Sequence, residues 1–292
     1  MQTPIIGRLA EISGRYDALF CDLWGCLHNG LAPFPQAVEA LRAFRGKGGK
    51  VILLTNAPRP RAAVRRQLAR FGVPDDCWDD IASSGDASQA GMAAGLAGTK
   101  VYHIGPEKDL SFFTDLPADI DAAHIERVPL DQAEGIICTG LFDDMTETPA
   151  DYTATLLYAK QKRLRLLCTN PDVVVDVGDK RIFCAGAIAE AYTEIGGESL
   201  YFGKPHPPIY TLARQRLAAL APVDDARILC LGDGILTDIQ GGIAENLDTL
   251  FITGGLAAGE FGADRDTPDP GLLEPWLARH QLSPTYAIPA LK

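Results

Sequence analysis

Acidic residues follow two of the apolar segments of this 292-residue chain. Asp22 comes directly after the run Ala18 to Cys21, and Asp233 comes shortly after the run Ile228 to Leu231, with Asp238 five residues further on. Two carboxylates at adjacent strand ends repel each other unless a hard divalent cation lies between them. Mg²⁺ held by one or two carboxylates, water and phosphate is the usual arrangement. One of the carboxylates is then a candidate nucleophile.

A hydroxyl, an amide and a lysine also follow apolar segments of the chain, as the acidic residues do. Thr55 and Asn56 follow the apolar run Val51 to Leu54, and Lys204 follows Tyr201 and Phe202. A phosphoryl group needs such partners, because positioned donors and positive charge stabilise its spread negative charge. Each feature alone has an ordinary explanation as a turn, a helix cap or a surface lysine. All of them in this order, at the ends of apolar runs, indicate a site for phosphoryl chemistry.

These residues need a scaffold that brings strand ends together. Short β-rich runs alternate with amphipathic helical patterns, which predicts a parallel sheet covered by helices. In such a sheet, ligands bind beyond the carboxyl ends of the strands. The predicted strands are Ala18 to Cys21, Lys50 to Leu54, Lys100 to Ile104, Gly135 to Cys138, Leu164 to Cys168, Arg227 to Leu231 and Thr249 to Thr253. Helical faces are predicted at Ala37, Leu41 and Phe44, at Val64, Leu68 and Phe71, and at Ile209, Leu212, Ala213 and Leu217.

Composition and charge exclude several classes of protein. Hydrophobic residues make up 47% and charged residues 22% of the chain, as in soluble globular proteins, and the length suggests two domains or one with a large insertion. No apolar run approaches the roughly 18 residues of a membrane-spanning helix, and Met1 to Tyr16 lacks an export signal, so we expect a cytoplasmic protein. The net charge of −11 argues against a nucleic-acid partner.

The seven cysteines form no zinc or redox motif. They include no C-x-x-C pair, and Cys21, Cys138, Cys168 and Cys230 each follow an apolar run, where a thiol behaves as a small hydrophobic group. We prefer this interpretation to redox chemistry. A nucleotide-binding P-loop is also excluded, because Gly203 and Lys204 are followed by Pro205.

Five segments together resemble the haloacid dehalogenase superfamily of hydrolases that use an aspartate nucleophile. They are DLWGCLHNG (22 to 30), LLTNAPR (53 to 59), CTNPD (168 to 172), GKPHPPIY (203 to 210) and GDGILTDIQGG (232 to 242). The chain looks most like subclass IIA, with a C2-type α/β cap, which includes nitrophenyl phosphatases, pyridoxal phosphatases and nucleotide monophosphatases. The resemblance implies an α/β fold with a doubly wound, Rossmann-like parallel sheet as core and an inserted α/β cap domain.

The resemblance assigns roles to individual residues. It implies that Asp22 is the nucleophile and forms an aspartyl-phosphate, while Thr55, Asn56 and Lys204 hold the transferring phosphoryl group. It further implies that Mg²⁺ is bound by Asp22, the backbone carbonyl of Trp24 and Asp233, with Asp238 acting through water or from behind these ligands. The expected substrate is a small phosphorylated metabolite.

The same resemblance divides the chain into a core of residues 1–85 and 184–292 and a cap of residues 86–183. It places the turn Thr169 to Asp172 over the core site, so that Asn170 and Asp172 are candidate substrate-binding residues. Asn-Pro-Asp also favours a tight turn for purely structural reasons. Related capped proteins often pair through the cap, which makes a homodimer an expectation here.

One position departs from the pattern of the superfamily's phosphatases. They carry a second Asp two residues after the nucleophile, which protonates the leaving group and later activates water, and here that residue is Trp24. An indole N–H only donates hydrogen bonds and transfers no proton at neutral pH. His28 is a candidate substitute, although a single histidine in a loop is more often structural. We therefore expect slow turnover of alkyl phosphates and less impairment with aryl phosphates.

Trp24 leaves three functions open. The first is a Mg²⁺-dependent phosphomonoester hydrolase. The second is a dehalogenase, because such enzymes have an aromatic residue at this position and release halide without a proton or a metal. The third is a catalytically inactive relative that binds a phosphorylated metabolite or a partner protein. Retention of Asp233, Asp238, Thr55 and Lys204 favours the first.

Overall fold

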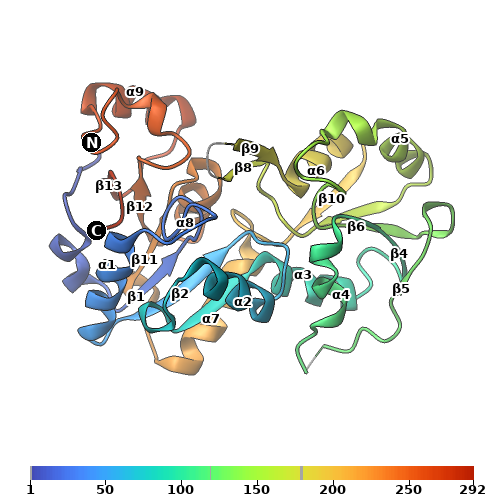
Figure 1. Cartoon of the computed structure of the whole chain (residues 1–292), viewed down its shortest axis with the longest axis horizontal. Coiled ribbons are helices and arrows are strands. Elements are labelled where there is room, and N and C mark those ends of the chain that lie inside the picture. Colours follow the sequence, from blue (N-terminus) through green and yellow to red (C-terminus); the bar gives the residue numbers. More distant parts are fainter. Residues whose placement is uncertain (1, 119, 178–179) are drawn as a thin grey trace.

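A six-stranded parallel sheet forms the larger half of the structure. The computed structural model describes residues 2–118, 120–177 and 180–292, and Figure 1 shows two sheets side by side in it. The strand order of the larger sheet is β13-β12-β11-β1-β2-β3, and all its pairings are parallel. Its strands are β1 (Ala18–Cys21), β2 (Lys50–Thr55), β3 (Asp80–Ser83), β11 (Ile228–Gly232), β12 (Asp248–Ile252) and β13 (Tyr286–Ile288).

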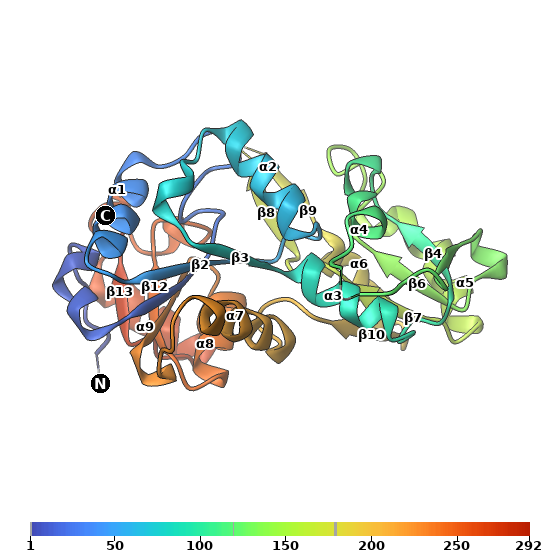
Figure 2. The same cartoon turned by 90° about the horizontal axis from the view of Figure 1, so that it is seen from below.

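Helices cover both faces of this sheet, because both sides of each central strand are apolar. In β1, Leu19 and Cys21 belong to the core cluster under helices α1 and α2, whereas Ala18 and Phe20 belong to the cluster under α7. Figure 2 shows α1 and α2 on one face and α7 on the other. The helices on this sheet are α1 (Pro35–Gly46), α2 (Arg61–Phe71), α7 (Pro207–Leu220), α8 (Gln240–Ala244) and α9 (Pro270–His280). The predicted doubly wound core is confirmed.

A second parallel sheet of five strands forms the other half, in the order β10-β7-β6-β4-β5. It packs helices on both faces as well, with separate apolar clusters under α5 and α6 on one face and around Phe112 on the other. Its strands are β4 (Lys100–Ile104), β5 (Glu126–Arg127), β6 (Gly135–Cys138), β7 (Arg165–Cys168) and β10 (Glu198–Tyr201). Its helices are α3 (Ser84–Ala93), α4 (Ser111–Thr114), α5 (Thr153–Gln161) and α6 (Ala185–Glu194).

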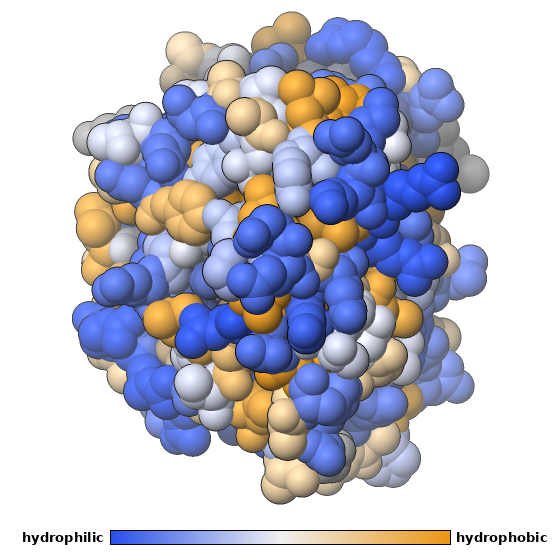
Figure 3. Space-filling model, turned by 90° about the vertical axis from the view of Figure 1, so that its right-hand side faces the viewer, coloured by the Kyte–Doolittle hydropathy of each residue, from blue (hydrophilic) through white to orange (hydrophobic). Residues whose placement is uncertain are grey.

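The outer end of this second half is drawn in Figure 3. Hydrophilic residues are spread over that face, and the hydrophobic ones lie among them in small groups. Within the part of the chain that the structure describes, no helix combines the length and the apolar character needed to cross a membrane.

The connection between the two halves differs from the predicted division at residue 183. Helix α6 packs in the core of the second sheet through Ile188 and Tyr192, and β10 pairs with β7. Residues 185–201 therefore lie with the second sheet and not with the larger one. We propose that the insertion continues to about Tyr201, because β10 completes the edge of its sheet.

An antiparallel hairpin projects from this inserted half toward the larger sheet. It consists of β8 (Val174–Val177) and β9 (Lys180–Phe183), and its strands pair only with each other among the described residues. Figure 1 shows it between the two halves. The predicted strands do not include β3, β5, β8, β9, β10 or β13, whereas the predicted strands at β1, β4 and β6 have the bounds observed.

Candidate active site

Asp22 and Asp233 meet at the centre of the larger sheet. Asp22 follows β1 and Asp233 follows β11, and these strands are parallel neighbours, with Cys21 level with Leu231. β1 is also where the chain order of the sheet reverses, the usual position of a ligand crevice in open α/β sheets. Side-chain ligand atoms of Asp22, Asp233 and Cys26 all lie within 4.8 Å of one another, and the three residues are buried.

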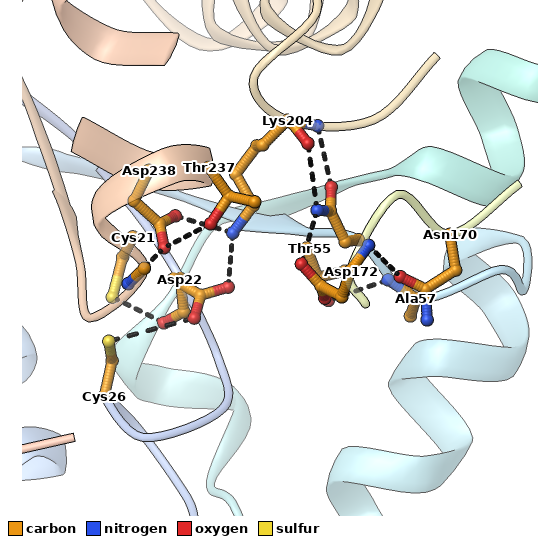
Figure 4. A network of polar contacts seen from close by, with 12 residues as sticks. Cys21, Asp22, Cys26, Thr55, Ala57, Asn170, Asp172, Lys204, Thr237 and Asp238 are labelled. Carbon is orange, nitrogen blue, oxygen red and sulfur yellow. Dashed lines mark hydrogen bonds and ion pairs between the residues drawn. The ribbon is translucent and has the colours of Figure 1, made fainter. Parts of the chain in front are cut away.

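Lys204 bridges two of the acidic residues. Its Nζ lies 2.5 Å from Oδ1 of Asp22 and 2.6 Å from Oδ1 of Asp238. Figure 4 draws Lys204 between these two carboxylates. Its relative exposure is only 2%, so its ordinary interpretation as a surface lysine does not hold. Burial lowers the pKa of Lys204, but Asp22, Asp238 and Asp172 outweigh this effect and raise it well above its usual value. The ammonium is therefore charged and faces the nucleophile candidate.

Asn56 fixes the backbone from which Lys204 extends. Oδ1 of Asn56 accepts a hydrogen bond from the Lys204 N–H at 2.7 Å, and its Nδ2 donates to the Lys204 carbonyl at 3.1 Å. The same Nδ2 donates to Oδ1 of Asp172 at 2.8 Å. The amide was predicted to bind a phosphoryl group, but in the structure its polar atoms hold Lys204 and Asp172. Thr55 is also buried, and its Oγ1 accepts from the Ala57 N–H at 3.2 Å.

The acidic residues raise one another's pKa. Burial is the main cause for Asp22, Asp233 and Asp238 alike, and each is raised further by another carboxylate. Lys204 lowers all three values but does not cancel these effects. A single ammonium thus faces more negative charge than it neutralises, and the site favours binding of additional positive charge.

The residues present fit a hard divalent cation. Carboxylate oxygens of Asp22 and Asp233 converge, and oxygen ligands are those that Mg²⁺ prefers. Gly25 and Gly255 pack against Asp233 so closely that a Cβ atom on either would overlap its carboxylate. Oδ2 of Asp233 also accepts from the Leu256 N–H at 2.9 Å. Loops from two sides therefore hold this carboxylate in a fixed position toward Asp22.

Cys26 is a neighbour of the site that the sequence did not point to. Its Sγ lies 3.8 Å from Oδ2 of Asp22, and burial raises the pKa of the thiol well above its usual value. A protonated thiol is a weak donor and a poor ligand for a hard cation, so Cys26 orients the Asp22 carboxylate. All seven cysteines are buried and unpaired, which agrees with their interpretation as small hydrophobic groups.

A cavity of about 170 Å³ lies directly over these residues. Asp22, Thr55, Lys204, Asp233 and Asp238 line it, together with Trp24 and Asp172. Thr237 and Arg265 also line it and were not predicted. Thr237 directly precedes Asp238 in the sequence, so its position near the cavity could have been predicted. Arg265 lies in a long loop without any motif, so no sequence pattern pointed to it.

A second cavity, of about 380 Å³, lies between the two halves of the chain and shares Trp24, Asp172 and Val175 with the first. Phe142, Met145 and Phe183 line it with partly exposed side chains. The shared residues place the second cavity next to the first one. Its wall is formed by residues of both halves.

Asn170 and Asp172 belong to the turn after β7, and only one of them reaches the first cavity. Oδ1 of Asn170 accepts from the Asp172 N–H at 3.0 Å and thereby closes the turn. Asn170 is buried and lines only the second cavity, whereas Asp172 lines both. Asn170 therefore shapes the turn and also lines the second cavity, and Asp172 faces both cavities.

Trp24 and His28 pack against each other in the loop after β1. Their rings contact edge to face at 5.0 Å, and the Trp24 ring lies so close to Gly30 that a Cβ there would overlap it. Nδ1 of His28 accepts from the Gly30 N–H at 3.0 Å, and burial lowers the pKa of His28 to about 4. His28 lines neither cavity among the described residues. A neutral imidazole in this position stabilises the loop and does not substitute for a catalytic acid.

Comparisons with known proteins agree with this geometry. A family described as haloacid dehalogenase-like hydrolase matches residues 19–117, and a family described as HAD-hydrolase-like matches residues 201–282. The solved structure of a haloacid dehalogenase-like family hydrolase from Brucella suis 1330 is 38% identical, with a TM-score of 0.85, over 98% of this chain and 100% of that one.

Two more distant relatives carry the names of phosphatases. A 4-nitrophenylphosphatase from Schizosaccharomyces pombe is 22% identical over 88% of this chain and 90% of its own length. A solved structure of a glycerol phosphate phosphatase from Mycobacterium tuberculosis, in complex with magnesium, is 22% identical with a TM-score of 0.63, over 90% of this chain and 74% of that one. From the site, the fold and these likenesses, the chain belongs to the haloacid dehalogenase-like family and is a hydrolase.

Proposed function

We propose that this hydrolase cleaves small phosphomonoesters with the help of a divalent cation, Mg²⁺ being the best fit, and that Asp22 is its nucleophile. The observation that carries this proposal is the buried contact of the Lys204 ammonium with Asp22, 2.5 Å from its Oδ1. An ammonium beside the attacking carboxylate can also bind an oxygen of the incoming phosphoryl group. The phosphatase names of the relatives support the same reaction.

The chain's own residues account for the steps of an aspartyl-phosphate mechanism. A carboxylate oxygen of Asp22 attacks phosphorus in line with the leaving group, the ester P–O bond breaks, and an acyl-phosphate forms on Asp22. Water then attacks phosphorus and releases inorganic phosphate and the free carboxylate. Lys204 and the Thr55 hydroxyl, which line the same cavity, stabilise the phosphoryl oxygens in both steps.

Asp22, Asp233 and the Trp24 backbone carbonyl would hold the cation, with Asp238 behind them. When bound, the cation neutralises part of the charge on the carboxylates and the phosphoryl group, so that an anionic substrate can approach an anionic nucleophile. The excess of carboxylates over ammonium groups in this cavity supports that role.

We further propose that the inserted half acts as a cap that selects the leaving group. The second cavity lies between the halves, and Phe142, Met145 and Phe183 present apolar surface in it. The same lining also includes the charged residues Arg59, Lys108, Asp109, Asp143 and Asp144, so a small phosphorylated metabolite with both apolar and polar groups suits it. Pairing of two chains through this half stays an expectation.

The decisive experiment assays 4-nitrophenyl phosphate with Mg²⁺ or with EDTA, using the wild-type protein, Asp22→Asn and Asp131→Asn. Asp131 is an exposed carboxylate far along the chain and serves as a charge-matched control. We expect metal-dependent turnover in the wild type and in Asp131→Asn and none in Asp22→Asn. Halide release from a 2-haloacid in EDTA would instead favour the dehalogenase, and inactivity in both assays would favour a binding protein.

A further inference from the structure

The proposed reaction needs a proton donor for the leaving group, and no residue has yet been assigned to this role. Release of an alcohol requires a proton on its oxygen, and a positioned general acid accelerates this step by roughly 10² to 10⁴. Trp24 lines the cavity but its indole cannot transfer a proton, and His28 does not line it. The proton must therefore come from another group on the cavity wall.

Most titratable groups on that wall are unsuitable among the described residues. Asp22 is the proposed nucleophile, and Asp233 and Asp238 lie with it around the proposed cation. Lys204 stays protonated because carboxylates surround it. An arginine such as Arg265 does not release its proton at any pH relevant to proteins.

Asp176 is a carboxylate on the same wall but is engaged elsewhere. Nε and the terminal Nη2 of Arg181 donate to its two oxygens at 2.7 and 2.9 Å. This pair lowers the pKa of Asp176, so its carboxyl stays ionised. Asp172 is then the remaining carboxylate of the wall.

Asp172 lies at the border between the space for the phosphoryl group and the space for the leaving group, because it lines both cavities. Figure 4 shows it on the side of Lys204 away from Asp238. Asn56 Nδ2 donates to its Oδ1 at 2.8 Å. This hydrogen bond favours a proton on Oδ2 over one on Oδ1.

The surroundings of Asp172 favour its neutral form. Burial raises its pKa above the usual value, Lys204 and the Asn56 hydrogen bond lower it in part, and Asp238 raises it again. Asp22 also interacts with it, and Asp176 and Arg265 line the same cavity. An anionic phosphoryl group entering the cavity adds further negative charge, so a carboxylate here would repel the substrate, whereas a carboxylic acid donates a hydrogen bond to it.

We propose that Asp172, contributed by the inserted half, is the general acid and base of the reaction; this rests on the proposed phosphatase function. As Asp22 forms its bond to phosphorus and the ester P–O bond breaks, the proton on Asp172 passes to the leaving oxygen and gives the neutral alcohol. The Asp172 carboxylate then takes a proton from the attacking water, the P–O bond to Asp22 breaks, and phosphate leaves with Asp172 protonated again.

The test compares Asp172→Asn with the wild type on glycerol phosphate and on 4-nitrophenyl phosphate. Nitrophenolate leaves without a proton, so we expect a pre-steady-state burst of it that keeps its wild-type rate, followed by slow turnover because water is no longer activated. With glycerol phosphate, kcat/KM should fall by roughly 10² to 10⁴. Asp176→Asn is the matched control from the same wall and should alter both substrates by the same factor.

A second variant separates chemistry from structure. Asp172→Ala removes the carboxyl, while the N–H that closes the turn with Asn170 is a backbone group and is kept. Formate should restore part of its glycerol phosphate activity, which a structural role does not explain. Equal loss of the burst and of glycerol phosphate turnover, without rescue by formate, would overturn the role of Asp172. Persistence of the burst in Asp22→Asn would overturn the proposed function itself.

Discussion

The Lys204 ammonium lies 2.5 Å from Oδ1 of Asp22, although 182 positions separate the two residues in the sequence. Both are buried, and the same ammonium lies 2.6 Å from Asp238. A buried charge without a partner costs several kcal/mol, so this contact links the stability of the larger sheet to the reactivity of the site.

Replacement of Lys204 by methionine should remove both activity and stability. Asp22 and Asp238 would be left as buried carboxylates without a counter-ion, and we expect the free energy of unfolding to fall by about 3 to 5 kcal/mol in EDTA. Urea unfolding at neutral pH measures this difference. Lys47→Met, at an exposed lysine, is the control and should change stability by less than about 0.5 kcal/mol. An equally small effect at Lys204 would contradict the importance of the ion pairs.

Mg²⁺ should stabilise the folded protein through Asp22 and Asp233. At a concentration 100 times its Kd, a ligand that binds only the folded state adds about 2.7 kcal/mol. We therefore expect the Tm to rise with Mg²⁺ in the wild type and in Asp131→Asn, and to rise far less in Asp233→Asn. Thermal unfolding in a Mg²⁺ titration measures this. A Tm response that is the same in all three proteins would mean that the ion binds elsewhere.

Gly25→Ala should disable the proposed metal site by moving Asp233. Gly25 has a φ of +70°, and an added Cβ would overlap the Asp233 carboxylate. Gly72→Ala is matched in backbone strain, because Gly72 has a φ of +80° but open space around its Cα. Both variants should lose about 1 to 2 kcal/mol from the positive φ. Only Gly25→Ala should also lose the stabilisation by Mg²⁺, as read from the same titration.

Acid should weaken the fold through His28. Burial lowers the pKa of His28 from 6.5 to about 4, so the unfolded chain binds more protons between these values. The stability from neutral His28 is present above pH 6.5 and is lost as the pH falls toward 4, by about 2 kcal/mol at pH 5.

The variant His28→Asn tests this, because the Asn oxygen can replace Nδ1 as acceptor for the Gly30 N–H. The difference in unfolding free energy between wild type and variant should shift in favour of the variant as the pH falls from 7.5 to 5. A difference that does not depend on pH would show that His28 titrates normally.

Local sequence was sufficient for the core strands and for the candidate nucleophile. The runs that became β1 and β6 are apolar and fully buried, and the run that became β4 is rich in β-branched and aromatic residues; such segments form parallel strands in most contexts. Asp22 follows β1 directly, so its place at a carboxyl end required only the strand itself. The hairpin β8–β9 and the edge strands β5 and β13 are short and partly polar, so their pairing depends on neighbours that no local pattern reveals.

Tertiary structure decided what the polar residues do. The side-chain amide of Asn56 holds Lys204 and Asp172, because folding brings a loop and a turn from distant parts of the chain to both of its ends. A catalytic role for His28 would have required its ring to face the cavity, and in the structure the ring packs against Trp24 instead. The sequence by itself determined the fold class and the strand ends that carry chemistry, because both follow from local periodicity. The partners of each carboxylate were decided only by the three-dimensional packing, since charges interact through space and not along the chain.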